Sequence, residues 1–295
     1  MAKAQIGIVG GSGIYNLEGL TAVKKVRINT PFGAPSDDFV LGELEGVKVA
    51  FLPRHAGGHG ISPSELPVKA NIYAFKSLCV KSIISVNAVG SLNEEIAPTD
   101  LVIPDQLIDW TRGRDNTFFT NGIVGHVSMA EPFCPVLSQT LIKAATEFGA
   151  KVHSGGTYIV MEGPQFSTKA ESRLYRGWGA DVIGMTALPE AKLAREAEIC
   201  YAILAFVTDY DCWRPSFESV TTEMILTNLR KGVEVAKKIL KLAISSVPEE
   251  RDCTCDSALK YAIATVPEYI PEKTKRSLDL IVGKYITKAF DEHLS

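Results

Sequence analysis

Two carboxylic acids stand two residues apart in the segment Thr208–Asp211, at the end of the apolar run Cys200–Thr208. A carboxyl group at the end of a buried strand loses hydration, and a second carboxylate nearby repels its negative charge. Both effects raise a pKa, so one of the two acids can serve as a general acid near neutral pH. Asp209 directly follows the apolar run and is the preferred catalytic candidate, whereas Asp211 is as readily a turn or helix-capping residue.

A cationic loop follows a second apolar run. Arg54 and His55 come one proline after Val47–Leu52, and His59 follows among three glycines. A guanidinium group and an imidazole suit bidentate contact with an oxyanion such as phosphate, although a surface salt bridge and a structural histidine fit the same pattern. The two histidines are four residues apart, but the glycines between them oppose a helix and no accompanying glutamate completes a metal motif. No metal is therefore expected here.

A glycine-rich turn, Gly10–Gly13, follows the first apolar run and includes Ser12. Such a turn lets backbone amides and a hydroxyl approach an anion, and phosphate is the natural guest. A dinucleotide fingerprint would require glycine where Asn16 stands, and no Lys-Ser or Lys-Thr pair follows as in a nucleoside triphosphate loop. A glycine turn without any ligand is the remaining alternative.

The six cysteines carry less information. Cys253 and Cys255 form a pair that is compatible with redox chemistry or with half of a metal site, but no second cysteine or histidine pair lies near it in sequence. Two ordinary thiols are the favoured interpretation. The other four cysteines are scattered in or beside apolar segments and are expected to act as small hydrophobic residues in a reducing compartment: Cys79, Cys134, Cys200 and Cys212.

Alternating apolar runs and amphipathic stretches must position these groups. The expected strands are Ile6–Val9, Val47–Leu52, Ser82–Val89, Leu101–Ile108, Thr157–Met161, Asp181–Met185 and Cys200–Thr208. The expected helices are 66–79, 136–149, 169–178, 188–198 and 222–245. This alternation predicts an α/β fold with a buried central sheet, formed by one domain over residues 1–250 with a helical C-terminal extension of the same domain over 251–295.

Five polar segments follow expected strands at their carboxyl ends. They are Gly10–Gly13, Pro53–His55, Asn87–Gly90, Met185–Thr186 and Thr208–Asp211. Ligands of open α/β sheets bind outside the carboxyl ends of the strands. We therefore expect these segments to converge on one pocket.

Composition limits the partners of this pocket. The chain has 295 residues, 46% of them hydrophobic, and its 31 Lys and Arg against 34 Asp and Glu give a net charge of −3. This excludes a disordered tail protein and gives no electrostatic reason to expect nucleic acid or a membrane surface. No apolar stretch has the length of a membrane helix or a secretory signal, so a cytoplasmic protein with a small-molecule ligand is expected.

Many short blocks of the sequence, in order from about residue 5 to residue 245, resemble the trimeric purine nucleoside phosphorylase family. Besides the segments above, they include Met129–Pro135, Glu162–Ser167, Ala170–Ser172, Gly184–Thr186, Pro189–Glu190 and Thr208–Trp213. The last block resembles in particular the branch that cleaves S-methyl-5′-thioadenosine. The resemblance implies a single domain with a central twisted mixed β-sheet flanked by helices.

The reaction implied by this resemblance is phosphorolysis of a purine nucleoside, here S-methyl-5′-thioadenosine, to free base and a ribose 1-phosphate derivative, in purine and methionine salvage. Inorganic phosphate is then a co-substrate, and no metal or organic cofactor is implied. The resemblance also implies a homotrimer or a dimer of trimers, in which Glu131–Pro135 reaches across to a neighbour. The residues implied to hold phosphate are Ser12, Arg54, His55, Ala88 through its backbone, and Thr186.

The nucleoside contacts follow from the same blocks. Met185 is implied to lie against the ribose, His126 to line the 5′ end of the sugar on a neighbouring subunit, and Thr222 to begin the helix that closes the pocket. For the base, the implied contacts are Phe166, Ser167, Asp209 and Asp211, with the two aspartates at N7 and the 6-amino group.

The purine preference has a physical basis. A 6-amino group donates hydrogen bonds that an aspartate accepts, whereas a 6-oxo group needs a donor. Asp209 and Ser167 therefore favour adenine. The alternatives are a phosphorylase acting on adenosine, inosine, guanosine or methylthioinosine, and a non-catalytic nucleoside-binding protein on the same scaffold.

Overall fold

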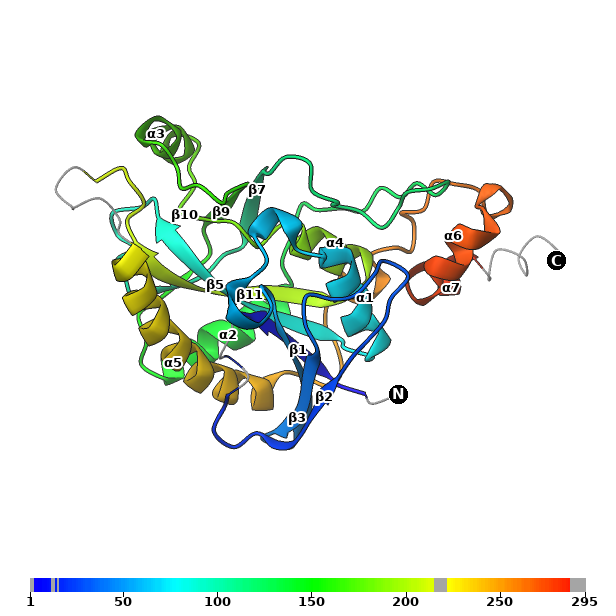
Figure 1. The fold of residues 1–295 in the computed structure, drawn as a ribbon, viewed down its shortest axis with the longest axis horizontal. Coiled ribbons are helices and arrows are strands. Elements are labelled where there is room, and N and C mark those ends of the chain that lie inside the picture. The colour runs from blue at the N-terminus through cyan, green and yellow to red at the C-terminus, as the bar shows by residue number, and fades with distance from the viewer. Residues whose placement is uncertain (1–2, 12–13, 15, 215–221, 287–295) are drawn as a thin grey trace.

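The fold is built around one mixed β-sheet with helices on both faces (Figure 1). The computed structural model describes residues 3–11, 14, 16–214 and 222–286. Within these residues the sheet has 11 strands, and the longest path of neighbours runs β2-β3-β4-β1-β5-β10-β9-β7. The predicted α/β class, with a central mixed sheet flanked by helices, is confirmed.

The strands differ greatly in length and burial. Their bounds are β1 Ile6–Gly10, β2 Thr21–Val26, β3 Phe39–Leu44, β4 Val47–Pro53, β5 Ser82–Ser91, β6 Leu101–Ile103, β7 Gln106–Trp110, β8 Val152–Ser154, β9 Thr157–Met161, β10 Val182–Gly184 and β11 Cys200–Asp209. β5 is central because it pairs in parallel with β1 and β11 and in antiparallel with β10. β11 is buried from Cys200 to Thr208, which explains its continuous apolar sequence.

The helices cover the two faces of the sheet with separate apolar cores. On one face, α2 (Pro135–Glu147) and α5 (Thr222–Ser246) pack on β11 and on each other. On the other face lie α1 (Val68–Ser77) and α4 (Glu190–Glu196), while α3 (Lys169–Gly177) stands at the edge near β10 (Figure 1). Among the described helices, none combines the length and the apolar character needed to cross a membrane.

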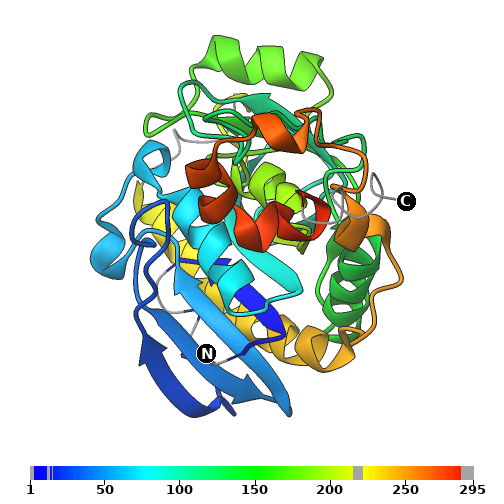
Figure 2. The same ribbon diagram turned by 90° about the vertical axis from the view of Figure 1, so that its right-hand side faces the viewer.

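The C-terminal residues cover part of the second face. After the short turns η3 (Thr254–Ser257) and η4 (Pro267–Tyr269), the helices α6 (Glu272–Ser277) and α7 (Asp279–Ile286) lie beside α1 (Figure 2). Apolar side chains of this region, such as Leu259, Leu278 and Val282, belong to the same core cluster as those of α1 and α4. The division into domains at residue 250 stays a prediction.

Three features differ from the sequence-based expectation. The strand expected over Leu101–Ile108 is two strands, β6 and β7, separated at Pro104, which cannot donate a backbone hydrogen bond. The strands β2, β3 and β8 were not predicted; β2 is exposed along most of its length and therefore lacks a buried apolar run. The segment Asn87–Gly90 lies inside β5 rather than after it, and β10 runs antiparallel to β5.

Candidate active site

A buried polar network joins the end of β4 to the middle of β5 and to the start of α4. Arg54 Nε lies 2.5 Å from Glu190 Oε1, and Arg54 Nη2 lies 3.1 Å from the other carboxylate oxygen. The same Nη2 donates to Ser85 Oγ at 2.6 Å. Arg54 and Glu190 are almost completely buried, at 2% and 1% exposed, so this is an ion pair without solvent screening.

Arg54 keeps its charge because of this partner. Burial alone disfavours the cation, but the carboxylate of Glu190 outweighs it, and the pKa of Arg54 is raised. The expectation of a bidentate contact between Arg54 and a bound anion therefore needs correction, because Glu190 already takes that position. Arg54 Nη1 lies 3.3 Å from the Val86 carbonyl and retains one N–H that no bond among the described residues uses.

The network continues from Ser85 along β5 to the loop after β10. Ser85 donates to Asn87 Oδ1 at 2.7 Å, and Asn87 Nδ2 donates to Thr186 Oγ1 at 2.9 Å. Thr186 is thus linked to Arg54 although their strands run in different directions. Ala88 follows Asn87 on β5, is exposed and has no bulky side chain to cover its backbone. Two of the predicted phosphate-binding residues, Arg54 and Thr186, therefore lie along one continuous set of contacts, and Ala88 lies next to it in the chain.

Two buried tyrosines, Tyr201 and Tyr158, lie beside this network. Tyr201 donates from its hydroxyl to Glu190 Oε2 at 2.9 Å. The Tyr158 hydroxyl is buried without a hydrogen-bond partner among the described residues, and burial raises its pKa to about 12. A Cβ at Gly184 would collide with this hydroxyl, so only glycine fits there, just before Met185.

One ring nitrogen of His55 is occupied by a hydrogen bond within the chain. Its Nδ1 lies 2.8 Å from the Ile61 carbonyl, which can only accept, so Nδ1 carries the proton. Burial, with a smaller effect from the charge of Arg54, lowers the pKa of His55 to about 4. At neutral pH the imidazole is therefore uncharged, and its Nε2 presents a lone pair. The ring stacks on His59 with the centroids 4.2 Å apart.

The two aspartates lie at the end of β11, as expected. Asp209 accepts from the Thr208 hydroxyl at 2.7 Å and from the Asp211 backbone N–H at 2.8 Å. Burial raises the pKa of Asp209 and the charge of Asp211 adds to the effect, while the two hydrogen bonds oppose it. Burial also raises the pKa of Asp211. The direction predicted from the position of the pair is confirmed.

The expected base contacts come together with this turn. The Cys212 thiol lies 3.2 Å from the Ser167 carbonyl, which joins the turn after β11 to the loop before α3. Ser167 Oγ lies 3.6 Å from the sulfur of Met161. Phe166, next to it, is 60% exposed and leaves a free aromatic face. Among the described residues, this arrangement offers an aromatic surface beside two carboxyl groups.

Arg114 was not predicted, yet it joins two loops of the site. Its Nη1 donates to the carbonyls of Met185 at 2.7 Å and Leu188 at 2.8 Å, and its Nε lies 3.1 Å from Glu162. The Met185 side chain in turn packs against Gly163. Arg114 therefore fixes the loop that carries Met185 and Thr186. A lone arginine in a polar segment carried no signal in the sequence that could have indicated this role.

Three predicted site residues stand apart from the groups above. Ser12 lies outside the described residues, as does the side chain of Thr222, although Thr222 is the first residue of α5. His126 is exposed, and its backbone N–H bonds to the Ala262 carbonyl in the C-terminal region. The segment after β7 runs toward α6, away from α3 (Figure 1). No contact within the described chain brings His126 to Asp209.

Glu190 and Ser85 were also missed as site residues. Glu190 belongs to one of the family blocks, but its distance of 136 residues from Arg54 in sequence gave no sign of their pairing. Ser85 sits inside an apolar strand, where a small hydroxyl residue is common. Neither residue carried a distinguishing signal, because β5 also buries Ser82, Asn87 and Ser91, and α4 also buries Glu196.

The chain matches the model of the phosphorylase superfamily over residues 5–245. It is 55% identical to an S-methyl-5′-thioadenosine phosphorylase of Geobacter sulfurreducens over 95% of this chain and 99% of that protein. It is 50% identical to a protein of the same name from Thermofilum pendens, over 89% of this chain and all of the other.

Solved structures give the same result. A methylthioadenosine phosphorylase from an Antarctic soil metagenomic library is similar with a TM-score of 0.92 and 49% identity, covering 95% of this chain and 99% of that one. A methylthioadenosine phosphorylase from Schistosoma mansoni, in complex with adenine, is similar with a TM-score of 0.80 and 39% identity, covering 87% and 96%.

Proposed function

This chain belongs to the phosphorylase superfamily, and we propose that it cleaves S-methyl-5′-thioadenosine with inorganic phosphate. The products are adenine and 5-methylthioribose 1-phosphate. The observation that carries this proposal is the half-buried pair of carboxyl groups at Asp209 and Asp211, which Cys212 joins to the loop that carries the exposed ring of Phe166. The names of the relatives that match nearly all of the chain support the same substrate.

The reaction exchanges one bond at the anomeric carbon. A phosphate oxygen forms a bond to C1′ while the bond from C1′ to N9 of the purine breaks. The electron pair of that bond passes to the base, which then needs a proton at N7 to leave as neutral adenine. Asp209 can supply this proton because burial raises its pKa, and a general acid in this position contributes about a hundredfold to ten-thousandfold in rate.

Phosphate is proposed to bind at the network of Arg54, Asn87 and Thr186. The free N–H of Arg54 Nη1, the Thr186 hydroxyl and the backbone of Ala88 are the donors for its oxygens, together with Ser12, which lies outside the described residues. His55 is neutral, so its Nε2 would accept the proton of a P–OH group rather than donate to the anion. This arrangement suits the monohydrogen phosphate ion.

The nucleoside is proposed to lie above the phosphate. Met185, held by Arg114 and Gly163, is placed to contact the ribose, and Phe166 and Ser167 the purine. A carboxylate accepts a hydrogen bond from the 6-amino group of adenine. Opposite a 6-oxo group, the carboxylate and the carbonyl oxygen would be two acceptors without a proton between them. Asp209 and Asp211 together therefore favour a 6-aminopurine over inosine or guanosine.

A complete site is proposed to need a second copy of the chain. His126 lies with the C-terminal region rather than with Asp209, so it would reach the 5′ end of a sugar bound to a neighbour. We propose a homotrimer or a dimer of trimers, with Glu131–Pro135 and Thr222 completing the pocket walls. No metal or organic cofactor is proposed for this reaction, and for location we keep the cytoplasm predicted from the sequence.

Product identification tests the proposed function. The protein is incubated with S-methyl-5′-thioadenosine, with and without phosphate, and followed by phosphorus NMR and by chromatography of the base. We expect adenine and a new phosphate monoester in equal amounts, and neither product without phosphate. Adenine release in phosphate-free buffer would identify a hydrolase, and no release in either case would leave only a binding protein; both results contradict the proposal.

A further inference from the structure

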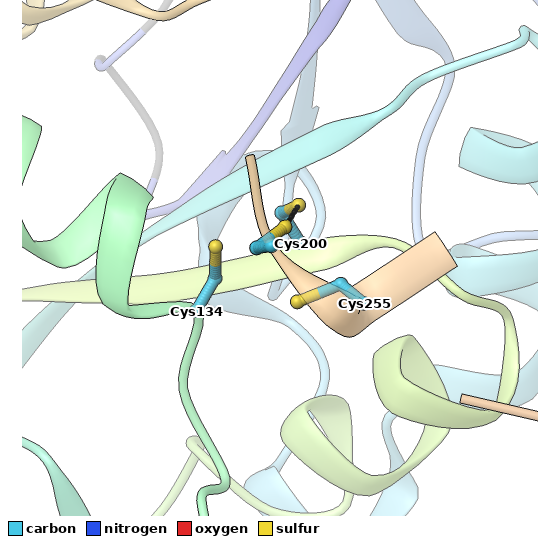
Figure 3. Close-up of side chains that lie close together, drawn as sticks. Cys134, Cys200 and Cys255 are labelled. Atoms are coloured by element: carbon cyan, nitrogen blue, oxygen red, sulfur yellow. Dashed lines mark hydrogen bonds between the residues drawn. The ribbon is translucent and has the colours of Figure 1, made fainter. Parts of the chain in front are cut away.

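Four cysteines that are far apart in the sequence meet at one point of the fold. The sulfur atoms of Cys134, Cys200, Cys253 and Cys255 all lie within 4.8 Å of one another. Figure 3 shows Cys134, Cys200 and Cys255 approaching from three separate segments of the chain. The interpretation of these residues as scattered small hydrophobic groups is therefore incomplete, because no local pattern indicates that Cys134 and Cys200 lie beside the pair at 253 and 255.

Each sulfur is held by a defined element. Cys134 precedes the first turn of α2, Cys200 begins β11, and Cys253 and Cys255 flank the start of the turn η3. Cys134, Cys200 and Cys255 are 1–3% exposed, and Cys253 is half-buried. Four thiols that together close off a buried space form a complete set of ligands, without an open position for a substrate.

The spacing suits a single metal ion. A tetrahedral zinc site has bonds of about 2.3 Å from zinc to sulfur, which separates the sulfurs by about 3.8 Å. The Cys200 and Cys253 sulfurs are already 3.5 Å apart, and every other pair is within 4.8 Å, so the side chains need only small adjustments. Iron–sulfur clusters also use four cysteines, but they spread their ligands over several irons and need more room.

A nearby arginine offsets part of the negative charge that four thiolates bring to such a site. Arg195 Nη1 lies 3.6 Å from the Cys255 sulfur, so a guanidinium group faces the cluster from α4. This positive charge stabilises negative sulfur, which is the form that binds metal. A pocket lined by Cys134, Cys200 and Cys253 reaches the exposed residue Glu250 and provides an entry path.

We propose that Cys134, Cys200, Cys253 and Cys255 bind one structural zinc ion with tetrahedral geometry. Each thiol loses its proton when its sulfur binds the ion, so four protons are released for each zinc ion bound. Its role is to fasten the start of the C-terminal region to the first residue of β11 and to the N-terminus of α2. The site is distinct from the network at Arg54 and takes no part in the proposed phosphorolysis.

Metal content of the untagged, full-length protein is the first test. The protein is purified under reducing conditions without added metal, and zinc, iron, copper and nickel are counted by mass spectrometry. We expect one zinc per chain. After removal of the zinc and addition of Co²⁺, we expect the visible bands of a tetrahedral ion and a thiolate-to-cobalt charge-transfer band in the near ultraviolet.

Cysteine variants locate the ion. Cys253→Ser changes the half-buried ligand, which is the least disruptive substitution, and Cys134→Ser changes a buried one. Cys79→Ser is the matched control, because Cys79 is exposed and lies outside the cluster. We expect both ligand variants to lose the zinc and to melt at a lower temperature, and the control to keep one zinc per chain. Thiol titration of native wild type should detect Cys79 and Cys212 rapidly, and the other four only after chelation.

Several outcomes would overturn the proposal. Wild-type protein without stoichiometric metal, together with four freely reactive thiols at these positions, would show an ordinary cysteine cluster. Disulfides among these four cysteines, found by mass spectrometry of unreduced peptides, would show a covalent cross-link in place of an ion. Zinc retained at one per chain in both ligand variants would place the metal elsewhere. The wild-type measurements do not depend on whether a variant folds.

Discussion

At the level of single residues, burial has opposite consequences for the two ends of the site. Among the described residues no cation lies beside Asp209, so burial raises its pKa and favours the protonated acid. Arg54 is even more buried, but Glu190 keeps it charged. Burial therefore gives two different results. Arg54 is paired with Glu190 and remains a fixed positive charge for phosphate, whereas Asp209 has no such partner among the described residues and becomes a proton donor for the base.

Substitution of Asp209 tests its proposed role as the proton donor. Asp209→Asn keeps the shape of the side chain but removes the acidic proton and adds an N–H donor. We expect kcat/KM for S-methyl-5′-thioadenosine to fall by about a hundredfold to ten-thousandfold, and some activity toward inosine to appear. The measurement is kcat/KM for both nucleosides on both proteins.

Asp105→Asn provides the control for this experiment, since Asp105 is exposed between β6 and β7. This variant should keep full activity. If Asp209→Asn retained the wild-type rate with S-methyl-5′-thioadenosine, Asp209 would be neither the proton donor nor the group that selects the purine.

At the level of elements, the site depends on where strands and one short helix end. The helix α4 carries a buried glutamate at each end, Glu190 toward Arg54 and Glu196 toward the segment after β7. Glu196 accepts from the Thr117 hydroxyl and from the Phe118 backbone N–H, both at 2.6 Å. Burial outweighs these two bonds and raises the pKa of Glu196 to about 7.

This shift predicts a pH dependence of stability. In the unfolded chain Glu196 loses its proton near its ordinary pKa, whereas the folded protein keeps that proton until about pH 7. Between these two values the folded state binds more protons, so its stability falls as the pH rises. The loss is on the order of 3 kcal/mol, since one pKa unit corresponds to about 1.4 kcal/mol.

Urea unfolding at several pH values tests this dependence. Glu196→Gln has no proton to lose, so its free energy of unfolding should decline less than that of wild type between about pH 5 and about pH 8. Glu249→Gln, at an exposed position, should follow wild type. Parallel curves for wild type and Glu196→Gln would rule out Glu196 as the source of the effect.

The sequence predicted the elements that have their own periodicity or apolar run. β11 and the acidic turn after it were predictable because Cys200–Thr208 is continuously apolar and Asp209 comes next. The partner of Arg54 was not, because Glu190 is brought to it by the fold over 136 residues. The same reason hid the cysteine cluster, whose members come from α2, β11 and η3. Pairings across the fold leave no local pattern.

At the level of the whole molecule, the proposed site requires more than one chain. His126 and its neighbours extend toward the C-terminal region, whereas Asp209 and Phe166 lie near α3. Sedimentation velocity of the active protein, at the concentration used for the assay, should therefore give the mass of a trimer or of a hexamer. A fully active species with the 32.0 kDa mass of one chain would contradict this prediction.

A competition between nucleosides tests most directly whether the protein is a phosphorylase that prefers S-methyl-5′-thioadenosine. S-methyl-5′-thioadenosine, adenosine and inosine are mixed in equal amounts with the protein, with and without phosphate, and the loss of each is followed by chromatography. The relative rates give the ratio of their kcat/KM values. We expect S-methyl-5′-thioadenosine to be consumed first, inosine to be largely spared, and no nucleoside to be consumed without phosphate. Inosine consumed first, or any cleavage independent of phosphate, would contradict the proposed function.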